Sequence, residues 1–238
     1  MRGYAWILLT VLVCAHPFGA AETPLTRYRL QDCDKKLLAM VKRGPQFLAR
    51  DAIPVGALPD AATTQADIAV LLQLQATRTA ADVTAIQAEV GDLAPLFLRQ
   101  LPDIVQKRPA VLHALRATAA EVEFFLFAEK FALLRPRPHQ IDARIHPAIA
   151  VPHHPAYPSG HAGTARALAL VAARFAPAQR AELHAYGDAV GRRREIAGVH
   201  YPSDTAEGQR IGQLVAAKLL ANPGFLLLID AAKPPPDR

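Results

Sequence analysis

Between Thr64 and Leu220 the chain is a succession of helix-length apolar patterns, separated by prolines and glycines. Alanine and leucine dominate these patterns, whereas β-branched residues are scattered, and this composition favours helix over strand. No alternation of apolar and polar residues is long enough to indicate a useful strand. No repeat of fixed period and no glycine-rich linker divides the chain. The sequence therefore predicts an all-α protein with a single domain over residues 22–238.

The boundaries of the expected helices follow from capping residues and prolines. Thr79-Ala80-Ala81-Asp82 resembles a capping box that opens a helix reaching about Glu89. Further helices are expected over 34–48, from 64 onward, and over 111–134, 161–175, 179–196 and 203–220. Gly208 and Gly212 lie one turn apart on the last of these, where the missing side chains would let another helix approach closely. The most direct interpretation of the aromatic stripe on 111–134 is a set of core residues, namely Phe124, Phe125, Phe127 and Phe131.

Two segments are expected to lack regular structure. Residues 135–157 are rich in proline and histidine, and we interpret them as an irregular surface loop. The tail from Ala231 to Arg238 contains three consecutive prolines and is expected to fray.

The first 21 residues have the features of a secretory signal peptide. A charged Arg2 precedes the apolar stretch Ala5–Ala15, and Gly19-Ala20-Ala21 supplies small residues at a cleavage site. An uncleaved anchor helix is the alternative, and the shortness of the apolar stretch argues against it. The sequence thus predicts an exported, periplasmic protein in which Cys33 is the remaining thiol, so a disulfide-stapled scaffold is excluded.

The basic excess bears on the class of binding partner. The formal net charge is +6, or +5 after loss of Arg2 with the signal peptide. No long basic run is interleaved with aromatic residues, so nucleic acid is the weakest of the candidate partners. The longest apolar run after the signal, Ala167–Ala173, is far too short to span a membrane. A membrane surface and an anionic small molecule are the other candidates, and the sequence allows a homo-oligomer.

A first basic cluster surrounds the end of the helix expected over 111–134. Lys130 lies near that end, and prolines force the chain to turn at Arg135-Pro136-Arg137-Pro138. Three cations around one bend form a natural anion site. Taken alone, the cluster is also explained by basic residues that complement the helix dipole.

A second cluster, Tyr157-Pro158-Ser159-Gly160-His161, directly precedes an alanine-rich helix. Free backbone N–H groups at a helix start can bind an anion, and Gly160 lets that anion approach closely. Ser159 adds a hydroxyl and His161 a group that titrates near neutrality. A plain helix start with Ser159 as its cap is the alternative.

A third cluster follows the helix expected over 179–196. Three arginines, Arg192 to Arg194, end this helix, and His200 precedes the next one. Asp204 lies four residues after His200, so its carboxylate can bond one imidazole nitrogen and leave the other as a nucleophile or base. Asp204 could alternatively complement the dipole of the helix that it begins.

Together these clusters resemble the three-part signature of the type 2 phosphatidic acid phosphatase superfamily. The matching pattern is Lys130-x6-Arg137-Pro138, then Pro158-Ser159-Gly160-His161, then Arg194-x5-His200-x3-Asp204. The chain looks most like the bacterial class A non-specific acid phosphatases, which are related to vanadium haloperoxidases. The resemblance is strongest from Lys130 to about Gly212 and implies a helical bundle of that type, with its motif-bearing part at about 111–221.

The resemblance also implies roles for the motif residues. His200 would be the nucleophile that forms a phosphohistidine, oriented by Asp204, and His161 the general acid and base. The phosphate-binding residues would be Lys130, Arg137, Ser159, Gly160 and Arg194. Because three cationic side chains neutralise the phosphate, no metal and no cofactor are expected. The family usually has serine directly before the third-motif arginine, where this chain has Arg193.

The leading hypothesis is therefore an exported acid phosphatase for small phosphomonoesters, such as nucleotides, sugar phosphates and aryl phosphates. A vanadate-dependent haloperoxidase is a second hypothesis, although members of that family are usually larger. A non-catalytic anion-binding protein is a third, and it gives no reason for His161, His200 and Asp204 to occur together. The histidine-rich loop carrying His139, His146, His153 and His154 is interpreted as a polar rim of the substrate pocket rather than a metal site.

Overall fold

The computed structural model describes residues 28–54 and 56–232, and the expected signal peptide lies outside these residues. Its helices are α1 (Lys35–Arg43), α2 (Ala61–Thr77), α3 (Ala80–Ala88), α4 (Ala94–Leu98), α5 (Asp103–Gln106), α6 (Pro109–Leu133), α7 (Pro138–Ile141), α8 (Gly160–Ala172), α9 (Arg180–Ile196), α10 (Pro202–Leu219) and α11 (Pro223–Ala231), with short 3-10 turns at Leu30–Asp32 and Pro177–Gln179. The described residues contain no strand, which confirms the all-α prediction.

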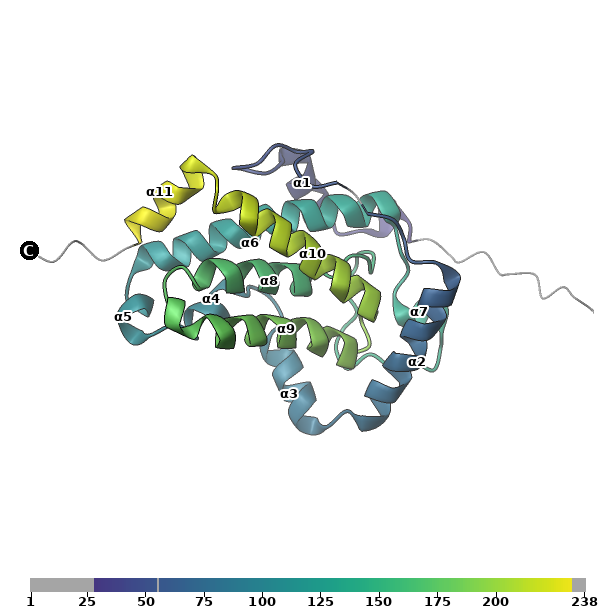
Figure 1. Cartoon of the computed structure of the whole chain (residues 1–238). Helices are drawn as coiled ribbons and strands as arrows, with labels where there is room; N and C mark the ends of the chain where they lie inside the picture. The colour runs from purple at the N-terminus through teal and green to yellow at the C-terminus, as the bar shows by residue number, and fades with distance from the viewer. Residues whose placement is uncertain (1–27, 55, 233–238) are drawn as a thin grey trace, which may run out of the picture.

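Helix α8 occupies the centre of the bundle. It packs against α6, α9 and α10, and the four helices run side by side (Figure 1). Helices α2 and α3 lie at one end of this group and contact α9, while α11 covers α6 at the other end (Figure 1). All three motifs lie at helix ends, so the order of these helices determines which motif residues meet.

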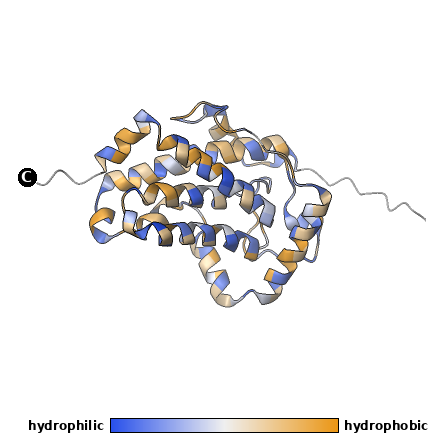
Figure 2. Cartoon of the chain, viewed as in Figure 1, coloured by the Kyte–Doolittle hydropathy of each residue, from blue (hydrophilic) through white to orange (hydrophobic). Residues whose placement is uncertain are grey.

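Alanine and glycine make the centre of the bundle thin. Helix α8 buries five alanines, and the helices around it carry both hydrophobic and hydrophilic residues (Figure 2). Ideal Cβ atoms built on Gly208 and Gly212 would lie 2.3 Å from the Ser159 carbonyl oxygen and 2.1 Å from that of Gly163. The expected close approach of a second helix is confirmed, and the partner is α8.

Local signals set several helix starts. Thr79 and Asp82 form the expected capping box at α3, and the Ser159 hydroxyl accepts the Ala162 N–H at 3.4 Å to cap α8. Proline occupies the first turn of α6 and α10, where its missing N–H removes no helical hydrogen bond. The expected helix over 34–48 is shorter, because Gly44 with φ +91° ends α1.

The segment expected to be an irregular surface loop is irregular over most of its length, but it does not lie wholly on the surface. Residues 135–157 include the short helix α7, and Arg135, Arg137, Ile145 and Tyr157 are buried. The guanidinium groups of Arg135 and Arg137 have hydrogen-bond partners inside the protein, and these partners offset the free-energy cost of burying the two charges. Helices α4, α5 and α11 were also not anticipated, because they are short or follow no clear apolar period.

No single helix among the described residues is long and apolar enough to cross a membrane. Helices α10 and α11 together reach the necessary length and composition, but they are bent by 84° at the break between them.

Candidate active site

The eight motif residues converge at one end of the central four helices. Lys130 comes from the end of α6 and Arg137 from the residue before α7, while Ser159, Gly160 and His161 come from the start of α8. Arg194 lies near the end of α9, and His200 and Asp204 lie around the start of α10. A cavity of about 120 Å³ opens onto this point, and Gly160, His161, Arg194 and His200 line it.

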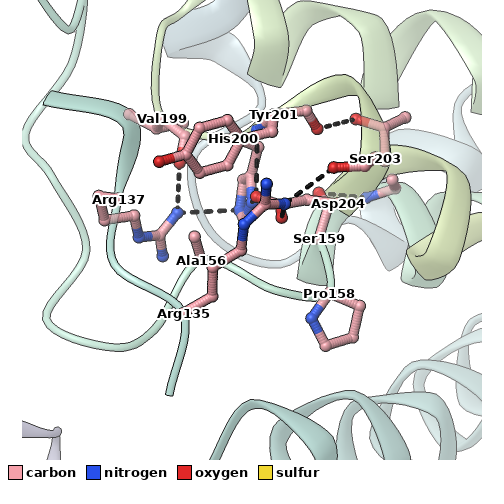
Figure 3. Close-up of polar contacts among 12 residues, drawn as sticks. Arg135, Arg137, Ala156, Pro158, Ser159, Val199, His200, Tyr201, Ser203 and Asp204 are labelled. Atoms are coloured by element: carbon pink, nitrogen blue, oxygen red, sulfur yellow. Dashed lines mark hydrogen bonds and ion pairs between the residues drawn. The ribbon is translucent and has the colours of Figure 1, made fainter. Parts of the chain in front are cut away.

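The imidazole of His200 is buried and fixed at both nitrogens (Figure 3). Nδ1 lies 3.0 Å from Oδ2 of Asp204, which can only accept, so Nδ1 carries the proton. Nε2 therefore presents its lone pair, which accepts a hydrogen bond from the Arg137 guanidinium at 3.0 Å. Burial, together with Arg137 and Lys130, holds the pKa of His200 well below its ordinary value. The arrangement maintains a neutral imidazole with an accessible lone pair.

Asp204 is held by more than His200. Its Oδ1 accepts from the Arg135 guanidinium at 2.6 Å, and its Oδ2 also accepts the Tyr201 N–H at 3.0 Å (Figure 3). Arg135 stacks over the Tyr201 ring, 3.8 Å from the centroid, and bonds Thr64 of α2 at 3.0 Å. Arg135, which the sequence placed in the anion-binding bend, thus lies behind the nucleophile and fixes its carboxylate partner.

Arg137 bridges the nucleophile and the loop before α8. Its guanidinium donates to the Val199 carbonyl at 2.6 Å and to the His154 carbonyl at 3.0 Å, and it lies 3.0 Å from His154 Nδ1. Burial lowers the pKa of Arg137 to about 10, so it remains a cation at neutral pH. His154 lines the cavity and packs edge-on against Phe127, with ring centroids 5.0 Å apart.

Lys130 is fully buried at the base of the site. Its ammonium donates to the carbonyls of Pro155 and Ala156, each at 2.9 Å, and to that of Pro158. Burial and Arg137 lower the pKa of Lys130 well below its ordinary value, and Asp204 opposes this shift. The ammonium thereby ties the loop before α8 to the end of α6 and adds positive charge beneath the cavity.

Arg194 has unused hydrogen-bonding capacity. Its NH2 group donates to the Ile86 carbonyl at 3.1 Å and to Oε2 of Glu89 at 2.9 Å. Its Nε and NH1 are buried and have no partner among the described residues. A buried donor without a partner costs roughly 1–3 kcal/mol, more for a charged group, so a bound anion would remove a substantial penalty.

Glu89 joins the two arginines that end α9. Its Oε1 accepts from Arg193 Nε at 2.8 Å, while its Oε2 accepts from Arg194. Arg193 therefore points at Glu89, and Arg192 is half-exposed and pairs with Glu195. The three consecutive arginines have three different environments.

His161 projects from the first turn of α8 toward the C-terminal end of α3, where Glu89 lies. Its Nε2 lies 3.0 Å from the Glu89 carbonyl oxygen, which can only accept, so Nε2 carries a proton and Nδ1 is the second nitrogen available for proton transfer. Burial and the charge of Arg194 lower the pKa of His161 to about 4. His161 is thus neutral at pH 7 in the absence of an anion.

The start of α8 has a helix cap and also backbone N–H groups that could bind an anion. The Ser159 hydroxyl caps the helix, and the backbone N–H of Ser159 donates to the Asp204 carbonyl at 2.8 Å. The first N–H groups of an α-helix, here at Gly160 and His161, have no acceptor within the helix and carry a partial positive charge. This end of α8 is directed at the same cavity as Arg194.

The remaining histidines are spread over different environments. His154 lines the cavity, as expected for a pocket rim, whereas burial lowers the pKa of His139 and of His184 away from it. Among residues 28–54 and 56–232, no group of three or more His, Cys, Asp or Glu side chains is arranged to hold a metal ion.

The sequence profile of the PAP2 superfamily matches residues 110–224. This range contains all eight motif residues and the helices that bring them together. Residues 110–224 of the chain belong to the PAP2 superfamily. A non-specific acid phosphatase from Salmonella typhi is 38% identical over 69 residues, which span 29% of this chain and 28% of that protein. The matched segment is thus less than a third of that acid phosphatase.

Two solved structures share the fold. A transmembrane PAP2-type phosphatidylglycerolphosphate phosphatase from Bacillus subtilis matches with a TM-score of 0.52 at 16% identity, over 82% of this chain and 91% of that chain. A bacterial vanadium-dependent iodoperoxidase matches with a TM-score of 0.50 at 15% identity, over 73% of this chain and 52% of that chain. The expected bundle of the phosphatase and haloperoxidase type is therefore confirmed.

Several contacts at the site were not anticipated from the sequence. Glu89, Arg135 and His154 contact motif residues directly, and Thr64 and Asp67 support Arg135 from α2. Arg135 and His154 lie within the recognised clusters, so their types and positions offered a signal. Glu89 ends a helix without a distinguishing pattern, and its role appears only once α3 packs on α9.

Proposed function

We propose that this PAP2 protein is an acid phosphatase that hydrolyses small phosphomonoesters. The observation that carries the proposal is the pair of buried Arg194 nitrogens that have no partner in the described part of the chain, beside a histidine whose lone pair borders the same cavity. A phosphate group satisfies those donors and places its phosphorus atom next to a nucleophile. Phosphoryl transfer depends mainly on positioning and charge neutralisation, and this cavity supplies both.

In the first step, His200 Nε2 attacks phosphorus. The Nε2–P bond forms while the bond from phosphorus to the ester oxygen breaks. The leaving alcohol takes a proton from Nδ1 of His161, which is protonated when the negatively charged phosphate group binds beside it. Arg137 must release Nε2 and bond the phosphate oxygens instead. Asp204 stabilises the positive charge that develops on the imidazole.

In the second step, water attacks the phosphohistidine. His161 accepts a proton from that water as the new P–O bond forms, and the Nε2–P bond breaks to return neutral His200. Inorganic phosphate leaves with the oxygen atom of that water, and His161 is protonated again. Lys130, Arg194 and the N–H groups at the start of α8 neutralise the phosphate throughout.

The same proposal includes export to the periplasm through the signal peptide over residues 1–21, which lies outside the described residues. The substrates are nucleotides, sugar phosphates and aryl phosphates, and no cofactor or metal takes part. These statements rest on the sequence features and on the fit of a phosphate to the cavity.

The test is hydrolysis of p-nitrophenyl phosphate from pH 4 to pH 7.5 in the presence of chelator. We expect turnover by the wild-type protein, a loss of at least a thousandfold in His200→Ala, and normal turnover in the control His113→Ala. Rapid acid-free quenching should trap a phosphohistidine at residue 200 by mass spectrometry. A folded wild-type protein without turnover would overturn the phosphatase, and vanadate binding with halide oxidation would then favour the haloperoxidase.

A further inference from the structure

Glu123 is a cavity-lining carboxylate that the proposed mechanism does not use. It lies on α6 one turn before Phe127 and two turns before Lys130, a spacing that places all three on one face of the helix. Glu123 and Phe127 both line the cavity that contains His161 and His200. No hydrogen bond or ion pair to the Glu123 carboxylate is formed by the residues that the structure describes.

The surroundings of Glu123 are apolar rather than basic. Leu93, Ile149 and Pro152 also line the cavity. Burial and the negative charge of Asp92 raise the pKa of Glu123 to about 7. Asp92 itself pairs with Arg116 at 3.3 Å, so that arginine is already engaged.

The residues that line the cavity therefore fall into two chemically different groups. Arg194 and the start of α8 provide donors and His200 provides the nucleophile, and we call this group the phosphate end. The rise of 1.5 Å per residue separates Glu123 from Lys130 by about 10 Å along α6, which is the length of a small sugar phosphate rather than of phosphate alone. The alcohol part of an ester bound at the phosphate end would thus extend toward Glu123.

We infer that Glu123 is a specificity-determining residue, which accepts hydrogen bonds from hydroxyl groups on the substrate's alcohol and disfavours esters that carry a second negative charge there. This inference rests on the proposed phosphatase function. An ionised carboxylate accepts strong hydrogen bonds from hydroxyl donors. It repels a second anion in a site partly shielded from water, where charges interact more strongly than in bulk solvent.

The experiment compares kcat/KM at pH 7.5 for three esters, using wild type, Glu123→Gln, Glu123→Leu and the exposed control Glu182→Gln. Glucose 6-phosphate offers hydroxyl groups, 6-phosphogluconate has a terminal carboxylate, and p-nitrophenyl phosphate has neither. We expect the wild type to favour glucose 6-phosphate over 6-phosphogluconate by at least tenfold. Glu123→Gln should raise kcat/KM for 6-phosphogluconate about tenfold. It should leave kcat/KM for p-nitrophenyl phosphate within twofold of the wild-type value.

Glu123→Leu should lower kcat/KM for glucose 6-phosphate by about fivefold or more, with p-nitrophenyl phosphate again within twofold as the measure of an intact fold. An unchanged ratio of the two sugar substrates, or an equal change for all three esters, would overturn the role of Glu123. Wild-type protein that hydrolyses none of the three would instead overturn the phosphatase itself. The two failures are therefore distinguishable.

Discussion

The Glu89 carboxylate accepts a hydrogen bond from the guanidinium of Arg194 at 2.9 Å, across 105 residues of sequence. A carboxylate beside an anion-binding arginine would by itself cancel the charge that the anion needs. Arg193 pairs with the other oxygen of Glu89, so the group of three side chains retains one net positive charge. Glu89 can thereby position Arg194 without neutralising the site.

Replacing Arg193 should accordingly weaken phosphate binding, although Arg193 points away from the unpartnered nitrogens of Arg194. We expect Arg193→Ser, the residue usual in the family at this position, to raise KM for p-nitrophenyl phosphate roughly fivefold. That effect corresponds to about 1 kcal/mol, as for the loss of one partly exposed charge. Inhibition by orthovanadate should weaken in parallel.

Arg192→Ser is the matched control, because Arg192 is half-exposed and pairs with Glu195 rather than with Glu89. It should leave both KM and vanadate inhibition within twofold. Equal effects of the two substitutions would contradict the compensating role of Arg193.

Arg135 should contribute far more to the free energy of unfolding than an arginine in an exposed ion pair. It pairs with Asp204 at 2.6 Å and with Asp67 at 3.6 Å, and all three side chains are buried. Arg135→Gln leaves two buried carboxylates without their cation, which costs about 3–5 kcal/mol. Thermal unfolding should show a fall in Tm of roughly 10 °C.

The control for this prediction is an arginine with the same pairing distance. Arg144 bonds Asp142 at 2.6 Å, but the arginine side chain is 71% exposed. Arg144→Gln should lower the free energy of unfolding by less than about 1 kcal/mol. A similar loss in both variants would show that burial is not what makes the Arg135 pair important.

The pKa of His161 should rise when phosphate binds. Burial and Arg194 lower it to about 4, and an added dianion beside Arg194 favours the protonated imidazole. Because kcat/KM reports the free enzyme and kcat the enzyme–substrate complex, the loss of activity with rising pH should occur at least one pH unit higher in kcat. His161→Ala should abolish this loss and lower kcat by about 10²–10⁴-fold. If kcat and kcat/KM lost activity at the same pH, His161 would not be the group that titrates.

Local sequence signals predicted the helices and the motif residues, but not the contacts between distant segments. The capping box at Thr79 and the proline at Pro202 locate helix starts within a residue or two, because each acts within one turn. Residues 135–157 are largely irregular as predicted, but their partial burial was missed because proline and histidine usually indicate exposure. Arg137 is instead buried by partners at Val199 and His154, which no local pattern encodes.

The same limit explains why Glu89 and Glu123 could not be assigned in advance. Neither lies in a recognisable motif, and each gains its role from helix packing. Glu89 meets Arg194 only when α3 packs on α9, and Glu123 lines the cavity only when α6 packs on α8. The spacing of Glu123, Phe127 and Lys130 on one helical face was readable, but its orientation toward a cavity was not.

Gly212 provides a test of the packing that brings α8 to α10. Alanine favours helix over glycine by about 1 kcal/mol, so an unconstrained helix would gain stability from Gly212→Ala. Here the new Cβ would lie 2.1 Å from the Gly163 carbonyl oxygen, and the helix backbones must separate. Overpacking typically costs about 1–3 kcal/mol, and a clash with backbone cannot be relieved by a change of rotamer. We therefore expect a net loss of at least about 1 kcal/mol in urea unfolding, together with reduced turnover because α8 carries Ser159 and His161 at its start.

Gln213→Ala, an exposed neighbour on the same helix, should change stability by less than about 0.5 kcal/mol. Stabilisation by Gly212→Ala would mean that the two helices do not approach as closely as the structure places them.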